Sequence, residues 1–311
     1  MEAPLNIQDF PVWDLDPDLF NLGPLTIRYY GVLFAAGLLL GFYLWRWQMR
    51  RANHDEEVTE KFLVWGVVTV LVGSRLGHCF FYEPEVYLKA PWKVLEVWKG
   101  GLASHGAALG LVISLILYAW RYGYSKLEIM DRFAMSVTMA ALFVRLGNFM
   151  NSEIVGREWY GPWAVRFARY AKINQSIFEY RIQKSLGYTI EALPRHPSQL
   201  YEALGALTIF GILLGVDKWL GEKRPRGIMA ALLLILYFSF RFFVEFFKEF
   251  QPSPLPLQLD AGAHVLRVVA EEGLTKGQLL SIPFVAFGTW MLVYAIVKRL
   301  PAAVKSTKVK E

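Results

Sequence analysis

The sequence predicts an all-α, polytopic membrane protein of about seven transmembrane helices, folded as one membrane domain over residues 1–311. Three observations support this fold class. Hydrophobic residues make up 55% of the chain and aromatic residues 15%. Charged residues make up only 19%, compared with about 25% in soluble domains. The apolar residues also form runs long enough for a hydrocarbon core of about 30 Å, and Lys and Arg lie between these runs.

Charge and cysteine usage exclude several other classes. The formal net charge is +6, but the basic residues are spread between the apolar runs and form no continuous face, so no nucleic-acid partner is expected. Cys79 is the only cysteine, and its apolar neighbours predict a buried, inert thiol. Residues 1–25 contain acidic side chains and no Lys or Arg. A secretory signal peptide opens with basic residues, so the first apolar run is expected to stay as a membrane helix.

We expect membrane helices at seven apolar segments: 26–45, 62–82, 104–121, 132–149, 198–217, 227–247 and 281–298. Basic residues follow the first, third, fifth and seventh, so the positive-inside rule places these ends in the cytoplasm. The N-terminus is then outside and the C-terminus cytoplasmic. The connections 150–197 and 248–280 lie outside, and 150–197 forms a small extracytoplasmic head between the fourth and fifth helices. Gly73 and Gly77 would allow the second helix to contact another helix closely.

Arginine occurs at membrane depth in three of these segments, as Arg75, Arg145 and Arg241. A guanidinium in hydrocarbon costs about 2.5–3.5 kcal/mol on insertion scales, so each requires compensation. Arg145 directly precedes a polar stretch that contains Asn148 and Glu153. A snorkelling side chain at a helix end would explain Arg145 taken alone, and a structural ion pair would explain Arg75.

Other polar residues lie at a similar depth. His105 is surrounded by small residues, and the unperturbed pKa of histidine, about 6.5, suits a general base, although a lone histidine is usually structural. Taken alone, Tyr30 is better explained as an interfacial anchor than as a site residue. Gln199 and Glu202 are three residues apart, which places them on one stripe of the fifth helix, just after His196.

In the sixth segment, Tyr237, Arg241 and Glu245 are spaced by four and share a helix face, where an Arg241–Glu245 pair would partly offset the burial of both charges. Cations gathered with His, Asn, Gln and Glu suit an anionic phosphate ester, since Arg binds phosphate in a bidentate manner. The implied ligand is a phospholipid headgroup. The sequence contains no metal-ligand spacing, nucleotide-binding loop or serine-nucleophile elbow, so no metal and no cofactor are expected.

Six motifs occur in an order that resembles the prolipoprotein diacylglyceryl transferase family. They are RYYG (28–31), GSRLG (73–77), GGLASHGAALG (100–110), VRLGNFMNSEIVGREW (144–159), RHPSQLYE (195–202) and YFSFRFFVEFF (237–247). The resemblance extends over most of the chain, and the fourth motif is highly specific. It implies an enzyme of the bacterial cytoplasmic (inner) membrane that transfers the diacylglyceryl group of phosphatidylglycerol to the lipobox cysteine of a prolipoprotein signal peptide and releases glycerol 1-phosphate. Its implied partners are these two substrates and the surrounding membrane lipids, without a cofactor.

The resemblance also implies roles for individual residues. His105 matches the family histidine proposed as a base, and Arg145 and Arg241 match arginines that handle the phosphate, so we expect these three to be catalytic. Other site residues of the family match Tyr30, Asn148, Glu153, Gly156, Tyr237 and Glu245, and we expect these to bind substrate. From their place in the chain we expect the same of Arg75, His196, Gln199 and Glu202. The chain departs from the family at Ala107, where glycine is usual. We expect this methyl group to be tolerated, because alanine is small and favours a helix.

Two other functions are compatible with these residues. A lipid or solute transporter would also contain intramembrane arginines, but the sequence has no inverted repeat and its polar groups fall in one half of the bilayer. A membrane-embedded assembly scaffold would use residues 150–197 to hold partners. Its function would not depend on Arg145 or His105, which distinguishes it from an enzyme.

Overall fold

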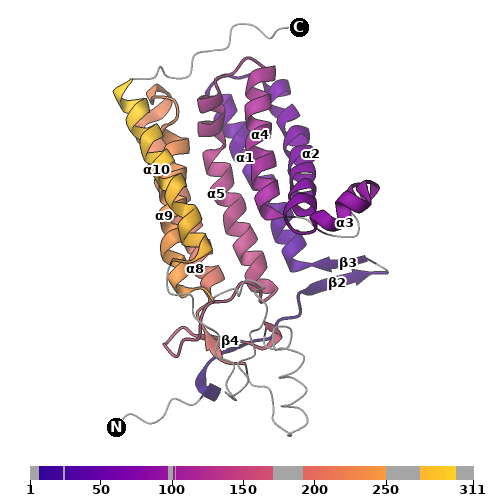
Figure 1. The fold of residues 1–311 in the computed structure, drawn as a ribbon. Coiled ribbons are helices and arrows are strands. Elements are labelled where there is room, and N and C mark those ends of the chain that lie inside the picture. The colour runs from indigo at the N-terminus through magenta and orange to yellow at the C-terminus, as the bar shows by residue number, and fades with distance from the viewer. Residues whose placement is uncertain are drawn as a thin grey trace. The chain divides into compact units, whose positions relative to one another are not determined.

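The computed structural model describes residues 7–23, 25–96, 101, 103–170, 192–249 and 274–298. Its long helices are α1 (Tyr29–Arg51), α2 (Glu56–Phe81), α4 (Ser104–Arg121), α5 (Lys126–Met150), α8 (Ser198–Leu220), α9 (Ile228–Val244) and α10 (Lys276–Val297) (Figure 1). Each predicted apolar segment coincides with one of these helices. Residues 171–191 of the expected head, most of the connection 248–280 and the chain after 298 lie outside the described residues.

Within the described residues, six helices are long and apolar enough to cross a membrane: α1, α2, α5, α8, α9 and α10. The apolar part of α4, His105–Arg121, is shorter. The prediction of an all-α polytopic membrane protein is therefore confirmed. The number of crossings and their orientation remain predictions.

Two helices begin well before their apolar segments. Helix α2 begins at Glu56 and α5 at Lys126, whereas the apolar segments begin at 62 and 132. The Asp55 carboxylate accepts a hydrogen bond of 2.9 Å from the Val58 amide and so caps α2. The first turns of these helices contain charged residues, so the hydropathy pattern, which marks only the hydrocarbon core, begins after them. The start of α2 is marked by its cap instead.

The structure adds two small sheets that the apolar pattern did not predict. One has the order β1 (Val12–Trp13), β4 (Val165–Phe167), β5 (Pro194–Arg195), with β1 parallel and β5 antiparallel to β4. The other is the antiparallel hairpin of β2 (Asp18–Leu22) and β3 (Leu25–Arg28). The first apolar segment was predicted to be helical from residue 26, which is wrong for its first three residues. Arg28 ends β3 and pairs with Asp18 at 3.0 Å across the hairpin, so strand pairing extends up to the start of α1.

The contacts divide the chain into two compact units. The first unit comprises Met1–Leu38, Thr138–Phe210 and Leu234–Phe287. The second unit comprises Leu39–Val137, Gly211–Leu233 and Gly288–Glu311. Helices α1, α5, α8, α9 and α10 contribute residues to both.

In the second unit, α2 and α4 pack through glycine, and Figure 1 shows them side by side. A Cβ atom added at Gly106 would lie 2.2 Å from the Gly73 carbonyl oxygen, and one added at Gly77 would lie 2.7 Å from the Gly106 Cα. No real Cβ contact is that short, so the two backbones touch only because the side chains are absent. The close helix contact predicted from Gly73 and Gly77 is thus present, and α4 supplies the facing glycine.

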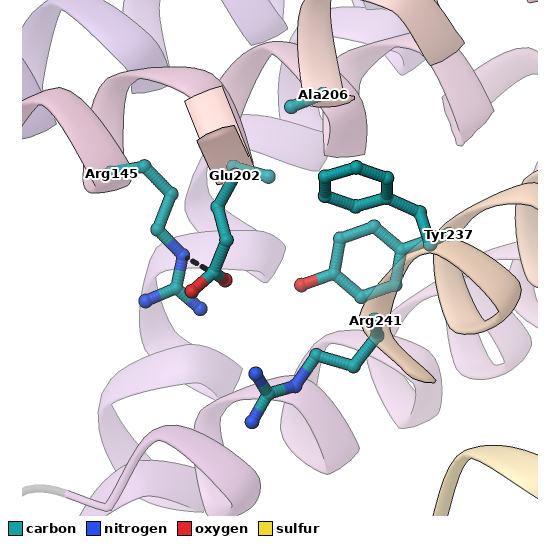
Figure 2. Close-up of a pocket in the computed structure, with 7 residues that line it drawn as sticks. Arg145, Glu202, Ala206, Tyr237 and Arg241 are labelled. Carbon is teal, nitrogen blue, oxygen red and sulfur yellow. Dashed lines mark ion pairs between the residues drawn. The ribbon is translucent and has the colours of Figure 1, made fainter. Parts of the chain in front are cut away.

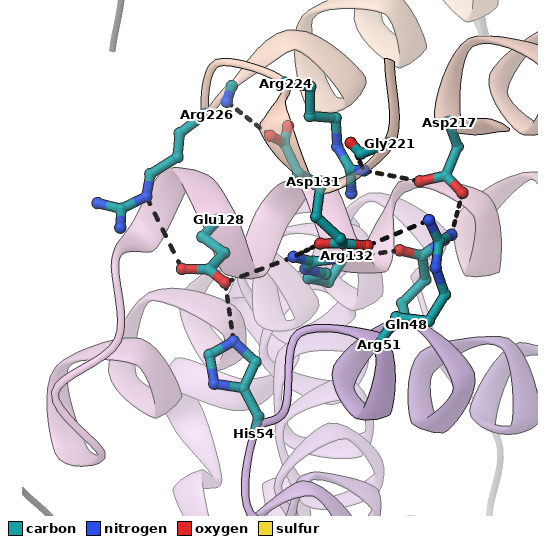
Figure 3. A network of polar contacts seen from close by, with 12 residues as sticks. Gln48, Arg51, His54, Glu128, Asp131, Arg132, Asp217, Gly221, Arg224 and Arg226 are labelled. Atoms are coloured by element: carbon teal, nitrogen blue, oxygen red, sulfur yellow. Dashed lines mark hydrogen bonds and ion pairs between the residues drawn. The ribbon is translucent and has the colours of Figure 1, made fainter. Parts of the chain in front are cut away.

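The second unit also contains a network of charged side chains (Figure 3). Asp217 is fully buried and pairs with Arg51 and, at 2.8 Å, with Arg224. The Asp131 carboxylate accepts hydrogen bonds from the backbone amides of Gly227 (2.7 Å) and Ala230 (2.9 Å), so a side chain of α5 caps the start of α9. Buried charges of opposite sign offset one another here, as apolar surroundings require.

Four further residues extend this network. The Glu128 carboxylate lies 2.8 Å from Nε2 of His54 and 3.7 Å from Arg132. Arg132 also pairs with Glu222. Several arginines that the sequence places in cytoplasmic connections therefore also hold helix ends together.

Candidate functional site

An open pocket in the first unit collects polar side chains from three helices. Arg145 comes from α5, Glu202 from α8, and Tyr237 and Arg241 from α9. Figure 2 shows both guanidinium groups and the Tyr237 hydroxyl directed into the same space. The empty volume is about 280 Å³, part of it open to the outside, and its remaining walls are the apolar residues Ala141, Ala206 and Phe240. Cationic groups beside apolar walls suit an amphiphilic molecule with an anionic group.

Glu202 is a buried carboxylate shared by two cations. Its Oε2 lies 2.8 Å from Nε of Arg145, and its Oε1 lies 3.1 Å from Nζ of Lys248. The Glu202 side chain is 5% exposed. Burial lowers the pKa of the Lys248 ammonium; Glu202 opposes this shift, and Arg241 and Arg145 add to it. Lys248 is therefore a buried cation whose charge depends on its carboxylate partner.

The predicted Arg241–Glu245 pair is present, with Arg241 in α9 and Glu245 in the 3-10 helix Glu245–Phe247 that follows it. Nη1 of Arg241 lies 2.8 Å from Oε2 of Glu245. A Cβ atom at Gly277 would lie 2.8 Å from the Glu245 carboxyl carbon, so the start of α10 closes over this carboxylate. The cluster then contains three cations (Arg145, Arg241, Lys248) and two carboxylates (Glu202, Glu245), a formal charge of +1. A singly charged anion would neutralise it.

Arg145 is also linked to the turn that follows α5. Its Nη1 donates to Oδ1 of Asn148 at 3.3 Å, and Nδ2 of Asn148 donates to the Glu153 carboxylate at 3.2 Å. The Glu153 amide bonds the Asn148 carbonyl at 2.9 Å, and the Ser152 amide bonds the Phe149 carbonyl at 3.0 Å. This pair of bonds is a Schellman helix end, in which the residue at the position of Ser152 normally has positive φ, as here (55°).

Ile154 has a positive φ that the helix end does not explain. Its φ is 57°, and for a β-branched residue this region is an outlier that costs about 1–3 kcal/mol. Two side chains at the start of α8 bond to this part of the chain. Ser198 Oγ donates to the Ile154 carbonyl at 2.8 Å, and Gln199 Nε2 donates to the Glu153 carbonyl at 2.6 Å.

Gly156 lies where two other backbone segments approach. A Cβ atom there would lie 2.5 Å from Cβ of His196 and 2.6 Å from the carbonyl oxygen of Phe247. His196 stacks on Trp159 at 4.7 Å between ring centroids, and its Nδ1 lies 2.9 Å from the Tyr201 hydroxyl. Burial lowers the pKa of His196. The described contacts of Gly156 and His196 are packing contacts and hydrogen bonds that join the head to the start of α8 and the end of α9.

Tyr30 packs on α5 beside the same turn. A Cβ atom at Gly147 would lie 2.7 Å from Cδ2 of the Tyr30 ring. Tyr30 also lies 6.3 Å from Phe34 between stacked ring centroids. Most of the predicted site residues therefore lie in the first unit, either in the pocket or linked to it by the contacts described above. They are Tyr30, Arg145, Asn148, Glu153, Gly156, His196, Gln199, Glu202, Tyr237, Arg241 and Glu245.

His105 and Arg75 belong to the second unit and are described within it alone. His105 is exposed in the first turn of α4. Arg75 is 4% exposed. Its guanidinium donates to the carbonyl oxygens of Val94 (2.9 Å), Lys93 (2.6 Å), Glu96 (3.2 Å) and Gly101 (3.2 Å). Arg75 thus organises the connection that precedes α4.

Sequence reasoning did not select Lys248 or Ser198. The signal for Lys248 was its spacing, three residues after Glu245 and seven after Arg241, which continues the polar stripe of α9 past its apolar run. Ser198 lies inside a motif that was noticed, yet its partner, the Ile154 carbonyl, is a backbone atom 44 residues away. Among the described residues, no group of three or more His, Cys, Asp or Glu side chains gathers as a metal site requires.

Comparison with known proteins is consistent with this geometry. Residues 17–294 match the family model described as prolipoprotein diacylglyceryl transferase. A protein of Tolumonas auensis is 36% identical over 282 residues, covering 90% of this chain and 96% of that protein. A protein of Chloroherpeton thalassium is 37% identical over 297 residues, covering 95% and 97%. One of Bacteroides fragilis is 35% identical over 294 residues, covering 91% and 94%. Each of the three is named phosphatidylglycerol–prolipoprotein diacylglyceryl transferase.

Proposed function

The chain belongs to the prolipoprotein diacylglyceryl transferase family, and from this membership we propose that it transfers the diacylglyceryl group of phosphatidylglycerol to the cysteine thiol of a prolipoprotein lipobox. The reaction is the first step of bacterial lipoprotein maturation and releases glycerol 1-phosphate. The protein acts as a multi-pass enzyme of the bacterial inner membrane.

The pocket formed by Arg145, Tyr237 and Arg241 is the observation that best supports this function. Its apolar walls suit the glycerol and acyl part of a lipid, and its cations suit the phosphate. The formal charge of +1 on the surrounding cluster matches the single negative charge of a phosphodiester.

The chemistry assigns a role to each group. The thiol must lose its proton, because the thiolate is the nucleophile. Its sulfur attacks the glycerol carbon that carries the phosphate; a carbon–sulfur bond forms, the carbon–oxygen bond breaks, and the electron pair stays on the phosphate oxygen. Arg145 and Arg241 stabilise that developing charge as fixed donors. His105 is the proposed base, and the thiol proton passes through it to solvent or to the released phosphate.

Replacement of Arg241 by alanine tests this proposal. Removing one fixed donor to a developing anion costs about 10²–10³ in kcat, so we expect Arg241→Ala to lower transfer to a fluorescent lipobox peptide by that factor. The assay uses purified protein with phosphatidylglycerol vesicles, and the product is identified by the mass of the peptide. Arg121→Ala is the matched control, because Arg121 is exposed at the end of α4 and contacts the Tyr122 ring.

The two arms of this test separate its possible failures. No lipid-modified peptide from the unaltered protein would contradict the transferase itself. Normal transfer by a folded Arg241→Ala protein would instead exclude Arg241 from the mechanism and leave the transferase intact.

A further inference from the structure

The turn after α5 adopts a conformation that its own sequence does not favour. Ser152 has positive φ as part of the helix end, but Ile154 has positive φ without belonging to it. A β-branched residue rarely adopts this conformation, so contacts from elsewhere must hold it there.

Those contacts come from the first two residues of α8. The Glu153 carbonyl belongs to the peptide group before Ile154, and the Ile154 carbonyl belongs to the peptide group after it. Gln199 Nε2 bonds the first at 2.6 Å and Ser198 Oγ bonds the second at 2.8 Å. Both peptide planes that define φ and ψ of Ile154 are therefore fixed by side chains, and Ser198 and Gln199 are each 0% exposed.

The Glu153–Ile154 peptide group, whose carbonyl Gln199 holds, is also part of the backbone of Glu153 and helps to set where the Glu153 side chain lies. Glu153 receives hydrogen bonds from Asn148 at 3.2 Å and from Asn151 at 3.1 Å. Asn148 in turn accepts the bond from Arg145. Rotation of the Glu153–Ile154 peptide group would shift Glu153, weaken its bond from Asn148 and leave the Arg145 guanidinium held by its ion pair with Glu202 among the described contacts.

We infer that Ser198 and Gln199 are positioning residues, which hold Ile154 in its strained conformation and thereby set the direction of the Arg145 guanidinium through Glu153 and Asn148. This inference rests on the proposed transferase function. It assigns a role to Ser198. For Gln199 it proposes positioning of the turn in place of the direct substrate contact expected from the sequence. The Ser198 hydroxyl and the Gln199 side-chain amide each donate to a backbone carbonyl of the turn.

A rescue experiment tests the inference. A small displacement of a catalytic group costs up to about 10²-fold in rate, so Ser198→Ala and Gln199→Met should each lower kcat by about tenfold or more, with a smaller change in KM. Ile154→Gly removes the penalty for positive φ. Combined with Ser198→Ala, it should restore kcat to within about threefold of Ile154→Gly alone. Ile154→Asn, which also tolerates positive φ, should rescue in the same way.

Ser281→Ala is the matched control. Ser281 is 1% exposed and its hydroxyl bonds the Gly277 carbonyl of its own helix at 2.7 Å, so it loses an equivalent buried hydrogen bond without affecting the turn. Its kcat should stay unchanged. Failure of both Ile154 substitutions to restore kcat in Ser198→Ala, or an unchanged kcat in both Ser198→Ala and Gln199→Met, would overturn the inference.

Amide hydrogen exchange provides a readout that does not depend on the reaction. The amides of Ser152 and Glu153 are hydrogen bonded in the turn, and Ser198→Ala should raise their exchange rates, whereas the combination with Ile154→Gly should restore them. Unchanged exchange in Ser198→Ala would contradict the positioning role even if the protein transferred no lipid at all. A protein without transferase activity but with this exchange pattern would contradict only the proposed function.

Discussion

Glu202 keeps two cations of the candidate site in place while leaving the cluster with an excess positive charge. Its two carboxylate oxygens form separate ion pairs with Arg145 and Lys248, so neither cation is left unpaired. Removal of one partner from a buried pair usually costs about 3–5 kcal/mol, because the other charge stays uncompensated. An incoming phosphodiester would compensate the remaining charge and share these cations with Glu202.

Lys248 provides the test at this scale. Lys248→Met keeps the length of the side chain and removes its charge, so the cluster falls from a formal charge of +1 to zero. A hydrogen bond between charged groups contributes about 1.5–3 kcal/mol, and we expect the KM for phosphatidylglycerol to rise about tenfold with a smaller change in kcat. Initial rates over a series of lipid concentrations measure both constants.

The control for Lys248→Met is Lys61→Met. Lys61 is half exposed and pairs with Glu57 one turn away in α2, at 2.7 Å. Exposed pairs of this kind contribute about 0.3–0.5 kcal/mol, so its KM should not change. An equal KM for Lys248→Met and the unaltered protein would show that the third cation takes no part in holding the lipid.

The sequence predicted which residues line the pocket better than it predicted which side chains contact one another. Arg241 and Glu245 are four apart in one helix, so helix geometry alone predicted their pair. Arg145 and Glu202 are on different helices, and no local spacing relates them. Arg75 was predicted to require a partner at membrane depth, but the carbonyl acceptors around it come from a connection whose backbone path the sequence does not determine.

At the scale of elements, the helices follow from apolar length and the strands do not. An apolar run of about 20 residues has few alternatives to a membrane helix. The strands β1 and β5 contain two residues each and depend on the neighbouring strand β4, so they leave no periodic pattern in the sequence. These strands matter for the site, since Trp13 of β1 donates to the Phe149 carbonyl at 3.1 Å and ties the sheet to the end of α5.

Contact between α2 and α4 predicts a strict requirement for glycine at Gly106. In Gly106→Ala the added methyl group would overlap the Gly73 carbonyl, so the helices must separate. Overpacking of this kind typically costs about 1–3 kcal/mol, and we expect a lower midpoint of thermal unfolding in detergent. Gly211→Ala is the matched control, because a Cβ atom added at Gly211 in α8 would have no atom within 4 Å. Its midpoint should be unchanged or higher, since alanine favours a helix by about 1 kcal/mol. Equal midpoints for the two variants would contradict the tight packing.

At the scale of the whole molecule, the basic residues that determine orientation are also structural. Arg51 and Arg224 pair with the buried Asp217, and Arg132 pairs with Glu222. The positive-inside rule counts these residues regardless of their partners, so they predict a cytoplasmic side for the connections that carry them. The connection between α8 and α9 is then cytoplasmic, and the head that precedes α8 is outside.

Two single cysteines test this orientation. Cys79 is 1% exposed and is replaced by alanine to give a background without thiols. Lys223 is exposed in the connection between α8 and α9, and Glu158 is exposed in the head. In intact cells, a thiol reagent that does not cross the inner membrane should label Glu158→Cys, and Lys223→Cys only after the membrane is permeabilised. Helix α8 lies between the two positions in the chain and is long and apolar enough to cross the bilayer. A difference in labelling between the two cysteines therefore tests whether α8 crosses the membrane, and the cysteine that reacts in intact cells tests the positive-inside rule. Labelling of both before permeabilisation would contradict the crossing, whereas labelling of Lys223→Cys alone would reverse the orientation.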